Sequence, residues 1–316
     1  MFLFTEKIAD WDDWERLFQS GPSFKALIEH IFEKENLPMS DIENLTPGTN
    51  AVFKVGKYVV KIYVPVELGD DFGTDFGVEL FGIKWANKQN VPSPKLVVYG
   101  EVDDKYHFRY MIMEHINGKL FSEIEKELSY NEKVIIGQKM RVITDRLNKP
   151  CENFTSIDVL RYALTDKEWN EAGFPESFRV ERLEYLKNVN ICDKDKVYCH
   201  GDIHSENVLV DDDFNLFIID FGDAMYAPLE FDRAYIVSGL FCFEKPYLIG
   251  YYGEYNVGDI VELCMKWLPI HVWGHAVVSA NLKPVSAITS FEIMHKRLDE
   301  LIRGQIEFID RFNVIF

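Results

Sequence analysis

The stretch that decides the fold is CHGDIHSEN at residues 199–207, followed by IIDFGD at residues 218–223. Three polar side chains in it, Asp202, Asn207 and Asp220, lie on short loops bounded by apolar segments. Short apolar runs separated by polar turns are typical of β-strands. The sequence therefore predicts a strand–loop–strand unit that presents two carboxylates and an amide on its loops.

These three side chains are suited to phosphoryl transfer. A carboxylate at Asp202 would accept or orient the proton of an attacking hydroxyl. The amide oxygen of Asn207 and the carboxylate of Asp220 would hold Mg²⁺ against nucleotide phosphates. Because Mg²⁺ retains water and phosphate ligands, few protein ligands are enough. We therefore predict Asp202 as the catalytic residue and Asn207 and Asp220 as metal ligands.

The spacing of the motif matches a known pattern. Asp202 precedes Asn207 by five residues, as in the kinase catalytic loop, and Asp-Phe-Gly follows at the kinase distance. Gly201 stands where protein kinases carry arginine. In this form, residues from about 46 to 232 resemble the superfamily of aminoglycoside phosphotransferases and choline kinases, which are protein-kinase-like small-molecule kinases.

The resemblance implies an α+β, bilobal protein-kinase-like fold. Its N-terminal lobe would be a small antiparallel sheet that binds the nucleotide, and its larger C-terminal lobe would be mainly helical. We place the first lobe, with its N-terminal helices, at residues 1–115. The second lobe, at residues 116–316, would hold the catalytic loop, the metal site and the acceptor pocket.

Apolar periodicity along the chain agrees with this division. Helical spacing occupies residues 10–19 and 23–36. Next come a β-hairpin, a helix and two further strands, which we predict at residues 51–55, 58–63, 79–89, 95–99 and 108–113. Beyond residue 118, capping-box patterns predict helix starts at Ser122, Ser129 and Thr165.

The resemblance also implies roles for residues that precede the motif in the chain. Lys61, in the second hairpin strand, would bind the α- and β-phosphates of the nucleotide. Glu79, at the start of the following helix, would hold Lys61 through an ion pair, and Glu67 is an alternative partner.

Residues 111–118 resemble the family hinge. The backbone at Glu114 and Ile116 would pair with the adenine edge, and Met113 would line the adenine pocket. Plain core packing is the alternative for Met113.

Three more residues near the motif would support the loop without reacting. By the resemblance, His200 braces the catalytic loop and Asp232 supports it. His204 is interpreted as a spacer or brace within the loop. A direct general-base role for His200 is the alternative.

The charge composition indicates which kinds of binding partner the protein has. The 34 Lys and Arg residues stand against 52 Asp and Glu residues, which gives a formal net charge of −18. Such a surface repels nucleic acid and favours a cationic ligand. We find neither a signal peptide nor an apolar run long enough for a membrane span. The five scattered cysteines indicate reduced thiols and a cytoplasmic location.

The acceptor is predicted to be a small molecule. Only 12 positions separate Asp220 from Asp232, which leaves no room for an activation segment that docks a peptide. Helical insertions at about residues 122–195 and 256–312 would form an acceptor pocket rich in carboxylates.

We therefore expect Mg²⁺-dependent transfer of the γ-phosphate of ATP or GTP to a hydroxyl of a cationic, aminoglycoside-like molecule. A kinase for choline, ethanolamine or another metabolite is the alternative on the same fold. A catalytically silent nucleotide-binding module is the alternative of another class.

Overall fold

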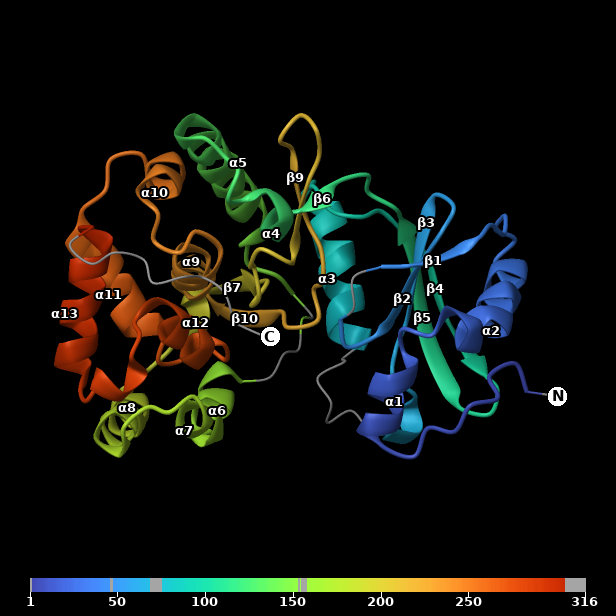
Figure 1. Cartoon of the computed structure of the whole chain (residues 1–316), viewed down its shortest axis with the longest axis horizontal. Helices are drawn as coiled ribbons and strands as arrows, with labels where there is room; N and C mark the ends of the chain where they lie inside the picture. The colour runs from blue at the N-terminus through green and yellow to red at the C-terminus, as the bar shows by residue number, and fades with distance from the viewer. Residues whose placement is uncertain (1, 46–47, 69–75, 153, 155–157, 305–316) are drawn as a thin grey trace. The chain divides into compact units, whose positions relative to one another are not determined.

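A computed structural model describes residues 2–45, 48–68, 76–152, 154 and 158–304 of the chain. The chain divides into two compact units, Met1–Asn117 and Gly118–Phe316. Figure 1 shows a sheet-containing first unit, in blue to green, and a mainly helical second unit, in green to red. Residues 305–312 of the predicted acceptor insertion lie outside the described residues.

The first unit is built on an antiparallel sheet of five strands in the order β1-β2-β3-β5-β4. Their bounds are β1 Ile42–Asn44, β2 Ala51–Val55, β3 Tyr58–Ile62, β4 Leu96–Asp103 and β5 His107–Glu114. The predicted hairpin is present, because Val55 pairs with Tyr58 across a turn in which Gly56 has a φ of 61°. Strand β1 was not predicted from the sequence.

Three helices of the first unit are α1 (Trp11–Leu17), α2 (Gly21–Lys34) and α3 (Phe76–Lys88), and the short turn η1 spans Val66–Leu68. The apolar sides of the N-terminal segment and α2 cover the sheet. The ring of Phe24 lies 4.9 Å from that of Phe4 and 5.6 Å from that of Phe53. This aromatic cluster gives the sheet a core of its own.

The second unit holds two small sheets. Strands β6 (Lys119–Leu120), β8 (Val208–Val210) and β9 (Leu216–Ile218) form one of them, in the order β6-β8-β9. Strand β7 (Lys196–Cys199) pairs with β10 (Met225–Pro228) in the other. The predicted strand–loop–strand unit is thus present, with the motif loop between β7 and β8 and the Asp-Phe-Gly segment after β9.

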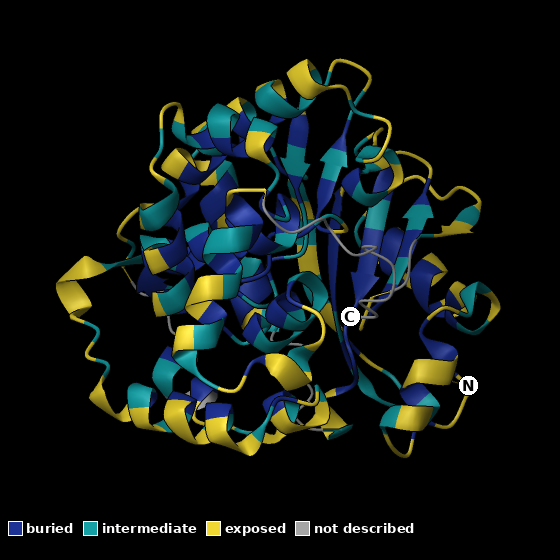
Figure 2. Ribbon diagram, turned by 60° about the vertical axis from the view of Figure 1, so that its left-hand side comes forward, coloured by how far each residue is buried: buried dark blue, intermediate teal, exposed yellow. Residues whose placement is uncertain are grey.

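Helices are the main regular elements of the second unit. They are α4 (Phe121–Ile124), α5 (Tyr130–Leu147), α6 (Val159–Ala163), α7 (Lys167–Glu171), α8 (Glu176–Asn188), α9 (Leu229–Tyr235), α10 (Lys245–Tyr252), α11 (Val257–Trp267), α12 (Gly274–Asn281) and α13 (Phe291–Ile302). Two short 3₁₀ turns, η3 (Asp193–Asp195) and η5 (Val285–Ala287), and a π-helical segment, η4 (Ile236–Leu240), lie between these elements. Figure 2 shows buried residues on the strands and on the inner sides of helices, with exposed residues on the outer sides.

The capping-box predictions had three outcomes. Ser129 forms the expected box, in which its side chain accepts from the N–H of Glu132 and the Glu132 carboxylate accepts from the Ser129 N–H. The prediction at Ser122 is wrong, because α4 has already begun at Phe121. At Thr165 the hydroxyl donates to the Glu168 carboxylate, but α7 begins two residues later, after Asp166.

None of the helices in the described residues is long and apolar enough to cross a lipid bilayer.

Candidate active site

Lys61 and Glu79 form a buried ion pair in the first unit. Lys61 lies on β3, opposite Val52 of β2 and Met111 of β5, and its Nζ is 2.7 Å from Glu79 Oε1. Glu79 is in the first turn of α3, where the partial positive charge of a helix N-terminus stabilises a carboxylate. Of the two candidate partners, Glu79 is therefore the one that pairs with Lys61.

Tyr63 completes this arrangement. Its hydroxyl donates to Glu79 Oε2 at 2.6 Å, so both carboxylate oxygens are hydrogen-bonded in a buried environment. The other candidate partner, Glu67, instead accepts from the backbone N–H of His107. No sequence motif pointed to Tyr63, which stands just after the strand and is two positions from Lys61.

The predicted hinge residues follow the course of β5. Met113 is buried and pairs with Val59 of β3, Glu114 is exposed at the strand end, and Ile116 lies two residues beyond it. The N–H of Glu114 donates to the carbonyl of Lys95 at 2.9 Å. A nucleotide contact at Glu114 would therefore use its carbonyl oxygen.

The catalytic loop of the second unit is shaped by Gly201. Its φ of 84° is in the left-handed region, and a Cβ at this position would collide with the carbonyl oxygen of Asp223. Only glycine allows this close approach between the loop and the segment after Asp220. The approach explains why the motif has glycine where protein kinases have arginine.

Asp202 is buried, with hydrogen bonds to both carboxylate oxygens. The hydroxyl of Tyr235 donates to Oδ1 at 2.9 Å, and the amide nitrogen of Asn207 donates to Oδ2 at 2.9 Å. The Nε2 of His204 is 3.3 Å from Oδ2. Burial opposes protonation of His204, but the hydrogen bond to Asp202 raises the pKa of this imidazole above its usual value. The structure thus places His204 against the predicted catalytic residue.

Backbone hydrogen bonds bring Asn207 close to Asp220. The N–H of Ile219 donates to the carbonyl of Asn207 at 3.1 Å, at the open end of the β8–β9 hairpin. Asp220 follows directly with a φ of 58°. The two predicted metal ligands therefore stand at the same end of one hairpin.

The donor set at this end fits Mg²⁺. Asn207 uses its amide nitrogen for the hydrogen bonds to the carbonyl and the carboxylate of Asp202. Its amide oxygen is thereby oriented away from Asp202 and keeps its lone pairs for another partner. Together with the carboxylate of Asp220, it offers the hard oxygen ligands that Mg²⁺ requires. No group of three His, Cys, Asp or Glu side chains in the described ranges is arranged to hold a metal.

Asp232 anchors the start of the catalytic loop. Its buried Oδ2 accepts from the N–H of His200 and from the side chain of Asn148, both at 2.8 Å, and its Oδ1 accepts from the N–H of Gly201 at 2.9 Å. The carboxylate thus fixes two consecutive backbone N–H groups just before Asp202. Asn148, at the end of α5, had no signal in the sequence.

His200 braces the loop from the inside. Burial lowers the pKa of His200, which favours the neutral ring. Its Nδ1 accepts from the N–H of Asp202, so Nε2 carries the proton and donates to the carbonyl of Ile219 at 3.1 Å. The ring therefore connects Asp202 to the residue before Asp220, and it has no proton-accepting nitrogen left for substrate.

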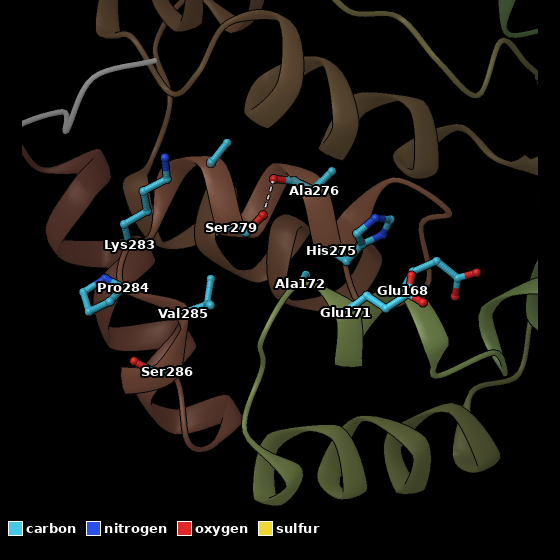
Figure 3. A pocket seen from close by; sticks show the side chains of 11 residues that line it. Glu168, Glu171, Ala172, His275, Ala276, Ser279, Lys283, Pro284, Val285 and Ser286 are labelled. Atoms are coloured by element: carbon cyan, nitrogen blue, oxygen red, sulfur yellow. Dashed lines mark hydrogen bonds between the residues drawn. The ribbon is translucent and has the colours of Figure 1, made fainter. Parts of the chain in front are cut away.

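A cleft of about 610 Å³ lies on the second unit, between α7, α12 and the segment that follows α12 (Figure 3). Glu168 and Glu171 lie beside His275 at one end, and Lys283 lies at the other. Helix α7 is held in place by the buried Trp169, which packs on the start of α12 at Gly274. Glu168 and Glu171 are among the carboxylates that the sequence placed in the acceptor region.

Comparison with known proteins identifies the class of enzyme. The profile of the phosphotransferase enzyme family, APH, matches residues 49–262, which is more than half of the chain. The chain belongs to this family, and it is a phosphotransferase of the small-molecule kinase class. The resemblance inferred from the His-Gly-Asp and Asp-Phe-Gly motifs is confirmed. The comparison with curated proteins found no match.

Solved structures of aminoglycoside phosphotransferases share the fold. The GDP complex of wild-type aminoglycoside 2'-phosphotransferase-IIIa has a TM-score of 0.58 and 17% identity, covering 91% of this chain and 100% of that chain. Spectinomycin phosphotransferase APH(9)-Ia, in complex with ADP and spectinomycin, has a TM-score of 0.51 and 18% identity, with coverages of 89% and 97%. For APH(3'')-Id from Streptomyces rimosus, in complex with ADP and streptomycin, the values are 0.52 and 17%, with coverages of 80% and 98%. The predicted α+β, kinase-like fold is confirmed.

The anchor at Asp232 leads to a prediction. In Asp232→Asn, an amide NH₂ replaces one carboxylate oxygen and faces N–H donors that were hydrogen-bonded. We expect the free energy of unfolding to fall by about 2 kcal/mol, the scale of a buried hydrogen bond to a charged group. Urea unfolding measured by tryptophan fluorescence tests this. The control is Asp212→Asn, an exposed residue in the β8–β9 turn. Equal stabilities of the two variants would contradict the anchoring role.

Proposed function

We propose that this enzyme transfers the γ-phosphoryl group of ATP or GTP, with Mg²⁺, to a hydroxyl of a small, cationic, aminoglycoside-like acceptor. The observation that carries the proposal is the arrangement of Asp202, Asn207 and Asp220 on two loops. Hydrogen bonds from Ile219 to Asn207 and from His200 to Ile219 join these loops. Family membership supports phosphoryl transfer. Solved structures with the same fold hold ADP or GDP, and some hold kanamycin, spectinomycin or streptomycin.

Each residue of the proposed site has its own role in the transfer. Asp202 orients the acceptor hydroxyl and accepts its proton, and the hydrogen bonds to both of its oxygens hold it ready for this role. Asn207 and Asp220 hold Mg²⁺, which neutralises charge on the phosphates when it is bound. Lys61, fixed by Glu79, binds the α- and β-phosphates. Most of the acceleration would come from positioning and electrostatic stabilisation.

The nucleotide base would be bound by the first unit. In this proposal the carbonyl of Glu114 and the N–H of Ile116 pair with the adenine edge, and Met113 lines the adenine pocket. The position of Met113 on the strand next to that of Lys61 supports this assignment, because both residues then belong to neighbouring strands of one sheet.

The cleft on the second unit is our candidate for binding the acceptor. Glu168 is half-buried there, and its carboxylate accepts from Thr165, which restricts its orientation. Its charge and that of Glu171 would bind amine groups of the acceptor. Lys283 at the opposite end repels cations, so amines are expected at the Glu168 end only.

The central prediction concerns Asp202. In Asp202→Asn the fold and the affinity for MgATP are expected to remain, while turnover falls about 10²-fold or more, the scale of general acid–base effects. The measurement is a panel of acceptors, including kanamycin, spectinomycin, streptomycin, choline and ethanolamine. Release of ADP or GDP is followed with each nucleotide. Full activity of Asp202→Asn would refute the assignment.

The same panel separates the remaining functions. Transfer to choline or ethanolamine alone would replace the aminoglycoside-like acceptor by a metabolite. Thermal stabilisation by MgATP, without transfer to any acceptor or to water, would indicate a silent nucleotide-binding module.

The metal site predicts a change in the Mg²⁺ requirement. Asp220→Asn keeps an oxygen ligand but removes its negative charge, which weakens the attraction for a divalent cation. We expect the Mg²⁺ concentration that gives half-maximal transfer to rise about 10-fold or more. Asp212→Asn, a change of the same charge on the exposed turn of the hairpin, is the control. An unchanged Mg²⁺ titration in Asp220→Asn would exclude this residue as a ligand.

The cleft predicts a charge effect on the acceptor. In Glu168→Gln the KM for a cationic acceptor should rise about 2- to 5-fold, the range of a partly exposed ion pair. In the matched variant Lys283→Gln it should stay the same or fall. Initial rates at saturating MgATP measure both. If Glu168→Gln leaves the KM of every cationic acceptor unchanged, the cleft is not where the amines bind.

A further inference from the structure

Tyr235 contacts the predicted catalytic carboxylate from a helix outside the sequence motif. It is the last residue of α9, it is buried, and its hydroxyl donates to Asp202 Oδ1 at 2.9 Å. Burial and the adjacent negative charge of Asp202 raise the pKa of the Tyr235 phenol well above its usual value. The phenol therefore keeps its proton and remains a hydrogen-bond donor.

The two oxygens of Asp202 are not equivalent. Oδ2 is contacted by two donors, the amide of Asn207 and Nε2 of His204, whereas among the described residues only Tyr235 contacts Oδ1. A carboxylate oxygen accepts about two hydrogen bonds through its lone pairs. Oδ1 is therefore the oxygen that retains a lone pair for the proton of an acceptor hydroxyl. The direction of the bond from Tyr235 decides where this lone pair points.

The ring of Tyr235 is itself held by an aromatic stack, formed by Phe231, His271 and Tyr235. His271 lies between the other two rings, with centroid distances of 4.3 Å on each side and an interplanar angle of 2° to Tyr235. Phe231 and Tyr235 share one face of α9, because they are four residues apart. Burial lowers the pKa of His271 to about 3, so the stack consists of uncharged rings. The stack leaves the hydroxyl of Tyr235 little freedom to leave Asp202.

We propose that Tyr235 is a positioning residue for phosphoryl transfer: its hydroxyl fixes the Asp202 carboxylate so that the remaining lone pair of Oδ1 faces the acceptor hydroxyl. This inference rests on the proposed function. Tyr235 acts through Asp202 and does not contact the phosphates or react. The hydroxyl contributes to the rate of transfer, and the ring contributes to packing.

The test compares two tyrosines of the second unit. Tyr235→Phe removes the hydroxyl and leaves the aromatic stack in place. Tyr247→Phe is the matched control, since the Tyr247 hydroxyl is also buried but has no hydrogen-bond partner among the described residues. The probes are MgATP with each acceptor of the panel, and MgATP hydrolysis by water. Rates are measured well below the unfolding midpoint of each variant.

We expect kcat of Tyr235→Phe to fall about 10- to 100-fold, the effect of losing a hydrogen bond to a charged group. The KM for MgATP should change less than about 2-fold, because only the orientation of Asp202 is altered. Tyr247→Phe should keep the kcat of the unaltered enzyme. A merely structural role would lower the unfolding midpoint of Tyr235→Phe without this loss of kcat, and it would overturn the proposal.

A double variant shows whether Tyr235 acts through Asp202. Adding Tyr235→Phe to Asp202→Asn should reduce the residual rate by less than 2-fold, because both changes affect the same interaction. If the rate losses of the two single variants multiply in the double variant, the proposal is overturned. If Asp202→Asn itself keeps full activity, the proposed function fails. If it loses activity while Tyr235→Phe does not, only the role of Tyr235 fails.

Discussion

The carboxylate of Asp232 is the group on which the active part of the second unit depends. It is buried, and a buried carboxylate is tolerated only when donors replace the water that it has lost. The donors here are the backbone N–H groups of His200 and Gly201 and the side chain of Asn148. The requirement of one buried charge thus fixes the backbone immediately before Asp202. The end of α5 and the start of α9 are joined to the loop by the same group.

From this anchor, hydrogen bonds extend in two directions. The neutral ring of His200 connects the N–H of Asp202 with the carbonyl of Ile219, so it joins the loop to the end of β9. Asn207 connects the same two segments through its own carbonyl and its amide. The close approach at Gly201 adds a steric limit, since a side chain there would push the loop away from Asp223. Rigid geometry of this kind is what catalysis by positioning requires.

The first unit also buries charged groups, in the ion pair of Lys61 and Glu79. Removing Lys61 and Glu79 from water costs free energy, and the attraction between them offsets this cost only with good geometry and further hydrogen bonds. Tyr63 supplies such a bond, and the N-terminal turn of α3 supplies a favourable field. An apolar pair of similar volume would often be no less stable. In the proposed function, phosphate binding by Lys61 accounts for the presence of these charges better than folding does.

The sequence predicted those parts of the fold that local residue patterns determine. The β2–β3 hairpin and the motif loop follow from strand alternation, a two-residue turn and motif spacing, whereas the pairing of Glu79 with Lys61 was implied by the family resemblance. It did not reveal Tyr63, Asn148 or Tyr235, because no periodicity or spacing records a contact made through the fold. Asn148 and Asp232, for example, are 84 positions apart. Strand β1 was missed for a different reason, since it has only three residues, two of them exposed, and carries no alternation of apolar side chains.

The net charge of the chain predicts only part of its binding preference, and the local charges of the site and the cleft determine the rest. A net charge of −18 repels a nucleoside triphosphate at long range, so in the proposed function the donor is bound through local cations, Lys61 and the Mg²⁺ that Asn207 and Asp220 would hold. The same charge attracts a cationic acceptor, but the cleft on the second unit refines this preference. Its two ends differ in sign, with Glu168 and Glu171 at one and Lys283 at the other. An acceptor with amines at one end and neutral hydroxyls at the other would match this distribution better than one whose positive charges are spread evenly.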